Sequence, residues 1–411
     1  MKINNSYLLR KIWSSCFYHA IIFQKISTQE VLMRSTENMS GPVVSDTAAD
    51  IFGTANSSCL KGIAIIMLLF HHCFLDPDRY EGQTLTFLIP EAYINYIAAF
   101  FKICVAIFVF VSAYGLTKKM MSFDGQEPAA LRKSISRMLR SRLIKLLGSF
   151  IFVFLLLNLA SLYFEPDRFF TIYGREFPDA IEYFIIDMLG LAQLLGTPTY
   201  IATFWYYSLA IVLILILPAM YLLYKKTGPV MFLSIITVIN FTVTFNNRNI
   251  WHYILCIAVG IVCAGENLIT KAVNYRGGSL LKNRVCKFAA EALLLFLLMV
   301  LREGPLKGEL YPFWDAVIPM VLTMFCCEFI FPLPVIRQIL DFLGKYSANI
   351  FLVHNFIRVK WFYDFTYSFK EPFLITLVLL LISLVLSILI EQLKKLLHYN
   401  QLLNRLIAGR R

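Results

Sequence analysis

Ten long apolar runs, separated by polar segments, constrain the fold of this chain more than any other feature. An apolar stretch of about 20 residues can cross the ~30 Å hydrocarbon layer of a membrane as one helix. In chain order, the runs are residues 58–75, 100–117, 143–163, 201–224, 228–245, 250–265, 286–302, 312–332, 342–360 and 372–393. They predict an all-α polytopic membrane protein with about ten transmembrane helices and both termini cytoplasmic.

The composition excludes an ordinary soluble domain. Hydrophobic residues make up 58% of the 411 residues and charged residues only 16%, and the apolar residues form continuous runs instead of amphipathic stripes. The nine cysteines are scattered, mostly inside these runs, without the spacing of a disulfide framework or a metal site. We interpret them as small core residues and expect no bound metal.

Lysine and arginine residues gather in alternate loops between the runs, and they account for the net charge of +12. Positively charged loops stay on the cytoplasmic side of a membrane. The loops after the second, fourth, sixth and eighth runs, and the segment after the tenth, are therefore expected to be cytoplasmic. The same pattern argues against nucleic-acid binding and identifies the lipid bilayer as the main partner.

The runs divide the chain into three parts. Residues 1–57 are polar and predict a poorly ordered cytoplasmic tail, 58–395 form the membrane domain, and 396–411 form a basic cytoplasmic tail. The long acidic loop 164–200 contains an apolar segment, 181–195, that carries two acidic residues. We interpret that segment as interfacial or re-entrant.

The first run, CLKGIAIIMLLFHHCFL at 59–75, contains ionisable residues: Lys61, His71 and His72. Ionisable groups inside a membrane span are costly and are therefore candidates for function. The eleven steps from Lys61 to His72 return to nearly the same helix face about 16 Å further along, whereas His71 lies about 80° away. His72 is either a general base reached from a polar cavity or a solvated histidine at the membrane border.

The third run is entered through a basic segment, RKSISRMLRSRLIKLL at 132–147. Lys133, Arg137 and Arg140 share one helix face there. Such a face could hold phosphates through charge-assisted hydrogen bonds, or it could contact anionic lipids and fix the topology. Three other polar or aromatic residues inside runs either line the same cavity as His72 or serve in packing: Ser112, Trp205 and His354.

Four motifs together resemble the acyltransferase 3 family of integral-membrane O-acyltransferases. LKGIAIIMLLFHH resembles the family's first-helix signature, in which ten residues separate a basic residue from a histidine. FVFVSAYGL resembles the family's FFVLSGFL helix. SRLIKLLG resembles its RRxxRxxP entry to the third helix, and LGKYSANIFLVH resembles its late LGxxSYxIYLxH pattern. Trp205 resembles the tryptophan of its middle element. The resemblance covers about residues 58–395, with Lys61 in place of the usual arginine and Gly148 in place of proline.

The resemblance implies transfer of an acyl group, most often acetyl, from acyl-CoA to a hydroxyl of a cell-surface glycan or lipid-linked sugar precursor. Acyl-CoA would be a co-substrate, with no permanently bound cofactor, and the enzyme would lie in the cytoplasmic membrane of a bacterium. By the same resemblance His72 is the base or a transient acyl carrier, and Lys61 orients the donor or the histidine. The remaining implied site residues are Arg137, Arg140, Arg142 and Lys145 for the CoA phosphates, and His71, Ser112, Trp205 and His354 around the cavity.

Two other functions fit the pattern of runs. A transporter or flippase of a lipid-linked sugar could also have about ten helices around a polar cavity, but it needs neither the Lys61–His72 stripe nor the basic segment. A non-catalytic scaffold among polysaccharide-assembly proteins would tolerate the loss of both. Such assembly proteins are also expected as partners of an acyltransferase of this kind.

Overall fold

The computed structural model describes residues 50–243, 248–275, 283–304, 308 and 310–408. All regular elements in these ranges are helices, which confirms the all-α prediction. Residues 1–49 of the predicted poorly ordered tail lie outside the described part of the chain.

Six helical segments are long and apolar enough to cross a membrane, and a bent pair of helices could form a seventh span. The chain is therefore an integral membrane protein. The six segments are α2 (Thr54–Phe74), α3 and α4 together (Glu91–Met121), α5 (Pro128–Phe164), η2 with α9 (Ala202–Thr227), α16 with η3 (Tyr311–Ile330) and α19 (Pro372–Leu396). The bent pair is residues 249–265, ending with α12 (Ile254–Gly265), and α13 (Leu268–Asn274).

Three further helices coincide with predicted runs but fall outside that set: α10 (Pro229–Thr242), α15 (Arg284–Glu303) and α17 (Pro334–Asn355). The total of ten spans and the cytoplasmic termini therefore stay predictions. The shorter elements are η1 (Pro77–Tyr80), α6 (Arg168–Tyr173), α7 (Asp179–Met188), α8 (Ala192–Leu195), α11 (Arg248–Trp251), η4 (Phe356–Trp361), α18 (Tyr363–Tyr367) and α20 (Tyr399–Ala408).

The third predicted span begins much earlier than the apolar run indicates. Helix α5 starts at Pro128, in the first-turn position that proline favours, and runs for 37 residues. The basic segment 132–147 is therefore helical throughout. The apolar segment 181–195, in contrast, is divided into α7 and α8, and Gly190 between them has a positive φ of 69°. No single helix crosses that segment.

Both ends of the membrane domain extend beyond their predicted limits. Asp50 accepts a hydrogen bond from the Tyr114 hydroxyl (2.9 Å) and pairs with Lys118 (3.1 Å). The backbone N–H of Ile51 donates to Thr270 Oγ1 (3.1 Å). Residues 50–57 are thus packed against the helices, and α20 continues the chain after α19 as an amphipathic helix on α5.

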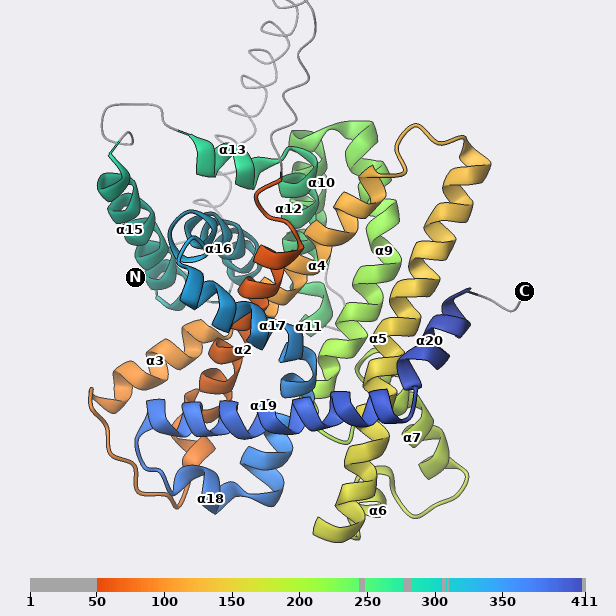
Figure 1. Cartoon of the computed structure of the whole chain (residues 1–411), viewed down its shortest axis with the longest axis vertical. Coiled ribbons are helices and arrows are strands. Elements are labelled where there is room, and N and C mark those ends of the chain that lie inside the picture. The colour runs from red at the N-terminus through yellow and green to blue at the C-terminus, as the bar shows by residue number, and fades with distance from the viewer. Residues whose placement is uncertain (1–49, 244–247, 276–282, 305–307, 309, 409–411) are drawn as a thin grey trace, which may run out of the picture. The chain divides into compact units, whose positions relative to one another are not determined.

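Helices α2 and α17 form the most extensive helix pair, in the middle of the bundle with α19 passing in front (Figure 1). Two glycines allow this approach. A Cβ at Gly62 would lie 2.2 Å from the carbonyl oxygen of Leu340, and one at Gly344 would lie 1.9 Å from that of Ser58. Small residues at such crossings let two backbones touch inside a membrane.

We expect Gly344→Ala and Gly62→Ala to separate α2 from α17, because either new methyl group would overlap backbone atoms that cannot rotate away. Overpacking of this kind costs about 1–3 kcal/mol. Thermal unfolding in detergent should show a lower midpoint for both variants. Gly115→Ala is the matched control, since its Cβ would meet nothing within 4 Å; equal midpoints for all three variants would contradict the close crossing.

Candidate active site

Two histidines meet where α2 and α17 run side by side. His72 Nδ1 lies 2.6 Å from His354 Nε2, and the two rings stack with centroids 4.9 Å apart and planes 16° apart. His354 is fully buried, whereas His72 keeps part of its surface exposed. A partly buried histidine held by a buried partner has the arrangement of a general base. We call this end of the two helices the histidine end.

His71 points elsewhere, as its position on the helix predicted. It is buried, and its Nδ1 lies 2.7 Å from the carbonyl oxygen of Ala98, near the C-terminus of α3. A carbonyl only accepts, so the ring N–H donates and satisfies one of the free carbonyls at the end of that helix. His71 therefore anchors α3. Its main contact is with that helix and not with the predicted cavity.

Arg358 is the residue at this end that the sequence analysis did not select. It is buried one turn beyond His354, and it donates to Asn355 Oδ1 (3.2 Å) and to the Tyr367 hydroxyl (3.2 Å). The Tyr367 hydroxyl in turn donates to the Cys73 carbonyl (3.3 Å). The guanidinium is near enough for its charge to act on both imidazoles, and no carboxylate pairs with it among the described residues.

The other two predicted cavity residues stand further from the histidine pair. Ser112 is exposed and interacts with the Tyr206 hydroxyl. The Trp205 ring stacks on Tyr253 at 6.1 Å. A row of ring contacts, Trp205 to Tyr206 to Phe351 to His354, links the tryptophan to the pair indirectly. In the described ranges, neither Ser112 nor Trp205 forms a hydrogen bond with His72.

A buried carboxylate pins the loop that precedes α9. Asp187 accepts hydrogen bonds from the Tyr173 hydroxyl (2.7 Å), Thr199 Oγ1 (2.9 Å) and the backbone N–H of Tyr200 (2.6 Å). Burial raises the pKa of Asp187. The Tyr200 ring stacks on Phe356 at 5.7 Å, two residues after His354. Asp187 therefore holds the loop against the histidine end.

Lys61 lies about three turns of α2 from His72, at what we call the lysine end. Lys61 is half-buried, and Arg142 of α5 is the cation whose charge acts on it most strongly. Asp341 also acts on Lys61 but forms its own ion pair with Lys345 at 2.7 Å. Across the described ranges Lys61 has no hydrogen bond or ion pair. A half-buried lysine that forms no ion pair of its own, with an arginine acting on it, favours an anionic ligand.

The four arginines and lysines predicted to hold phosphates do not form one cluster. Arg140 and Arg142 are about 160° apart around the α5 axis, and Arg140 donates to the Leu406 carbonyl of α20 (2.5 Å). Arg137 is exposed and forms no hydrogen bond or ion pair within the described part of the chain. Lys145, on the Arg142 side, lines a polar cavity of about 340 Å³ between α5, α19 and α20.

This polar cavity contains a second lysine that is already paired. Lys394 is buried and contacts Glu391 (2.8 Å) and Ser149 Oγ (3.1 Å), and Asn400 and Asn404 add amide groups to the lining. Lys145 is the cation of the cavity that stays exposed. The cavity thus offers one available positive charge and several hydrogen-bonding groups.

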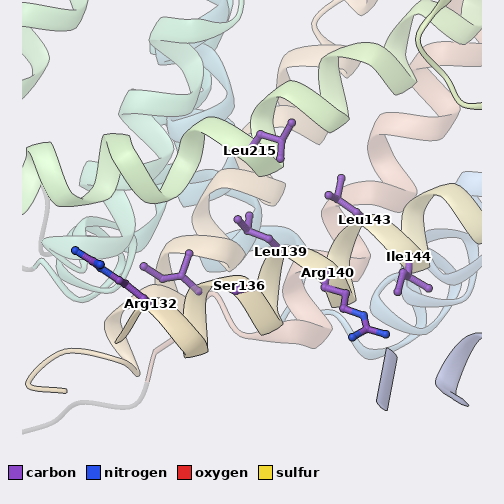
Figure 2. A pocket seen from close by; sticks show the side chains of 8 residues that line it. Arg132, Ser136, Leu139, Arg140, Leu143, Ile144 and Leu215 are labelled. Atoms are coloured by element: carbon purple, nitrogen blue, oxygen red, sulfur yellow. The ribbon is translucent and has the colours of Figure 1, made fainter. Parts of the chain in front are cut away.

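A second groove, of about 630 Å³, lies on the other side of α5 against α9. Figure 2 shows Leu139 and Leu143 on the side towards Leu215, with Arg132 and Arg140 near the two ends. Its lining is mainly apolar, so it suits a hydrocarbon chain better than a nucleotide. Among the described residues, no group of three or more His, Cys, Asp or Glu side chains is placed to hold a metal ion.

A family model described as an acyltransferase domain, that of acyltransferase 3, matches residues 55–392, which is most of the chain. The chain belongs to the acyltransferase 3 family. The resemblance seen in the sequence is thereby confirmed, and membership supports acyltransferase activity. No curated protein and no solved structure matches the chain. The matched range of this acyltransferase includes the histidine end, the lysine end and all of α5.

We expect Asp187→Ala to loosen the loop before α9 in this acyltransferase, because three donors would lose their acceptor in a buried site. Each buried unsatisfied group costs about 1–3 kcal/mol. Limited proteolysis of detergent-solubilised protein should cut the loop 164–204 faster in this variant. Asp179→Ala, on an exposed position of the same helix, is the control, and equal cutting rates would contradict the anchoring role.

Proposed function

We propose that this membrane protein transfers an acyl group, most simply acetyl, from acyl-CoA to a hydroxyl of a cell-surface glycan or its lipid-linked precursor. The observation that carries the proposal is the contact of the partly buried His72 with His354 inside an acyltransferase 3 domain. Lys61, which has no ion pair among the described residues and is acted on by the charge of Arg142, supports an anionic donor.

In this reaction His72 takes the proton of the acceptor hydroxyl as the oxygen attacks the thioester carbonyl carbon. The new C–O bond forms, the C–S bond breaks, and the proton passes from His72 to the departing CoA sulfur. Positioned acid–base catalysis of this kind contributes about 10²–10⁴-fold. Arg358, a buried cation close to both imidazoles, would oppose the negative charge that develops on the thioester oxygen.

The donor's phosphates would lie at the lysine end. Lys61 and Arg142, whose charges act on each other, would provide positive charge there, and Lys145 would extend it into the polar cavity beside α20. The thioester would then reach along the bundle for the ~16 Å that separates Lys61 from His72. With the lysine end cytoplasmic, as the basic loops predict, the acceptor would approach His72 from the outer side of a bacterial cytoplasmic membrane.

We expect His72→Ala to lower the rate at which isolated membranes transfer radiolabelled acetyl from acetyl-CoA to the glycan acceptor by about 10²-fold or more. His398→Asn is the matched control, because His398 is exposed, far along the chain after α19, and asparagine tolerates its positive φ of 50°. Full transfer by the His72 variant would refute the proposal. If even the unaltered protein transfers no acetyl but its loss stops export of lipid-linked sugar, the transporter function would replace it.

The two sides of α5 should differ in donor binding. We expect Arg142→Gln and Lys145→Gln to raise the KM for acetyl-CoA by about tenfold each, because each removes a charge-assisted contact worth about 1.5–3 kcal/mol. Arg137→Gln, about 140° from Arg142 around the α5 axis, should change KM less than about twofold, because Arg137 is not in the lining of the polar cavity or among the charges that act on Lys61. An equal effect of all three substitutions would show that the donor does not distinguish the two sides.

A further inference from the structure

The contact between His72 and His354 fixes which nitrogen of each ring carries a proton. His354 Nδ1 faces two backbone carbonyl oxygens, Phe351 O at 2.8 Å and Ile350 O at 3.2 Å. Carbonyl oxygens only accept hydrogen bonds, so Nδ1 of His354 must carry hydrogen. A neutral imidazole has one donor and one acceptor nitrogen. Its Nε2 is therefore the acceptor.

His72 then has one arrangement open to it. Its Nδ1 lies 2.6 Å from the accepting Nε2 of His354, so His72 Nδ1 is the donor of this bond. The lone pair of the neutral His72 ring is consequently on Nε2, on the side turned away from His354. A base needs a free lone pair facing its substrate, and the bond made by the other nitrogen decides where that lone pair lies.

We propose that His354 is a positioning residue that holds His72 in the tautomer whose Nε2 can accept a proton. The inference rests on the proposed role of His72 as the base. When His72 takes the acceptor's proton on Nε2, its Nδ1–H stays bonded to His354, and the bond becomes a stronger, charge-assisted one. No proton moves to His354 in this step.

The surroundings keep His354 in its tautomer. Its side chain is fully buried, and the Phe351 and Ile350 carbonyls belong to its own helix, so they cannot move away from Nδ1 independently. The Gly62–Leu340 and Gly344–Ser58 contacts hold α2 against α17. The other tautomer would place the lone pair of Nδ1 against these carbonyl acceptors, which leaves a buried polar group unpaired.

A matched pair of substitutions tests the role. In His354→Gln the amide oxygen can reach the position of Nε2 and accept from His72, whereas in His354→Asn the shorter amide reaches only the position of Nδ1. We expect His354→Asn to lower kcat by about 10²-fold with the KM for acetyl-CoA within about twofold. His354→Gln should retain kcat within about tenfold. Equal losses in both variants, or full kcat in His354→Asn, would overturn the inference.

A second measurement does not depend on acyl transfer. Diethyl pyrocarbonate acylates the unprotonated nitrogen of a neutral imidazole, so mass spectrometry can follow its reaction with His72 in detergent-solubilised protein, with exposed His398 as the internal reference. We expect labelling of His72 to be several-fold slower in His354→Asn and near normal in His354→Gln. Unchanged labelling in His354→Asn would overturn the inference. If the labelling rates are as predicted but the unaltered protein transfers no acyl group, only the proposed function is refuted.

Discussion

The contact on which the rest of the structure depends is the backbone approach of α2 to α17. Any side chain at Gly62 or Gly344 would meet a carbonyl oxygen of the opposite helix at about 2 Å, so only glycine permits this crossing. Within a membrane, lipid is as apolar as the helix surfaces, and close backbone packing becomes a main source of helix–helix affinity. The other helices around this pair, including α3, α4 and α19, are placed by contacts with α2 or α17.

The same crossing builds the histidine pair. His72 lies ten residues after Gly62, and His354 lies ten residues after Gly344. The two helices run in the same direction, so equal spacing from the crossing brings both rings to one level about 15 Å further along. The pair therefore depends on two glycines that contact no substrate. A shift of one residue in either helix would turn its histidine by about 100° and separate the rings.

The sequence was sufficient to predict the membrane class and the family, because apolar runs and the lysine–histidine spacing are local patterns; the catalytic role of His72 stays a prediction. The apolar run did not mark the start of α5 at Pro128, although the common helix face of Lys133, Arg137 and Arg140 already indicated helix before residue 143. The equal spacing of glycine and histidine in two motifs was the available signal for the His72–His354 contact. The signal available for Arg358 was its place as an ionisable residue inside the predicted run 342–360, but its burial depends on contacts with Asn355 and Tyr367 that the sequence does not show.

Charge compensation separates structural from functional cations in this bundle. Arg168, Lys287, Arg302 and Lys394 are buried, and each pairs with a carboxylate: Glu165, Glu328, Asp315 and Glu391. Removing one partner of a fully buried pair costs about 3–5 kcal/mol, so Lys287–Glu328 and Arg302–Asp315 hold α15 against η3 and α16, whereas the other two pairs are local ones. Lys61 and Arg358 differ, because no carboxylate pairs with either within the described ranges. Lys61 lies on α2 at the lysine end, where an anionic donor would need positive charge. Arg358 lies just beyond α17 at the histidine end, where a developing oxyanion would need it.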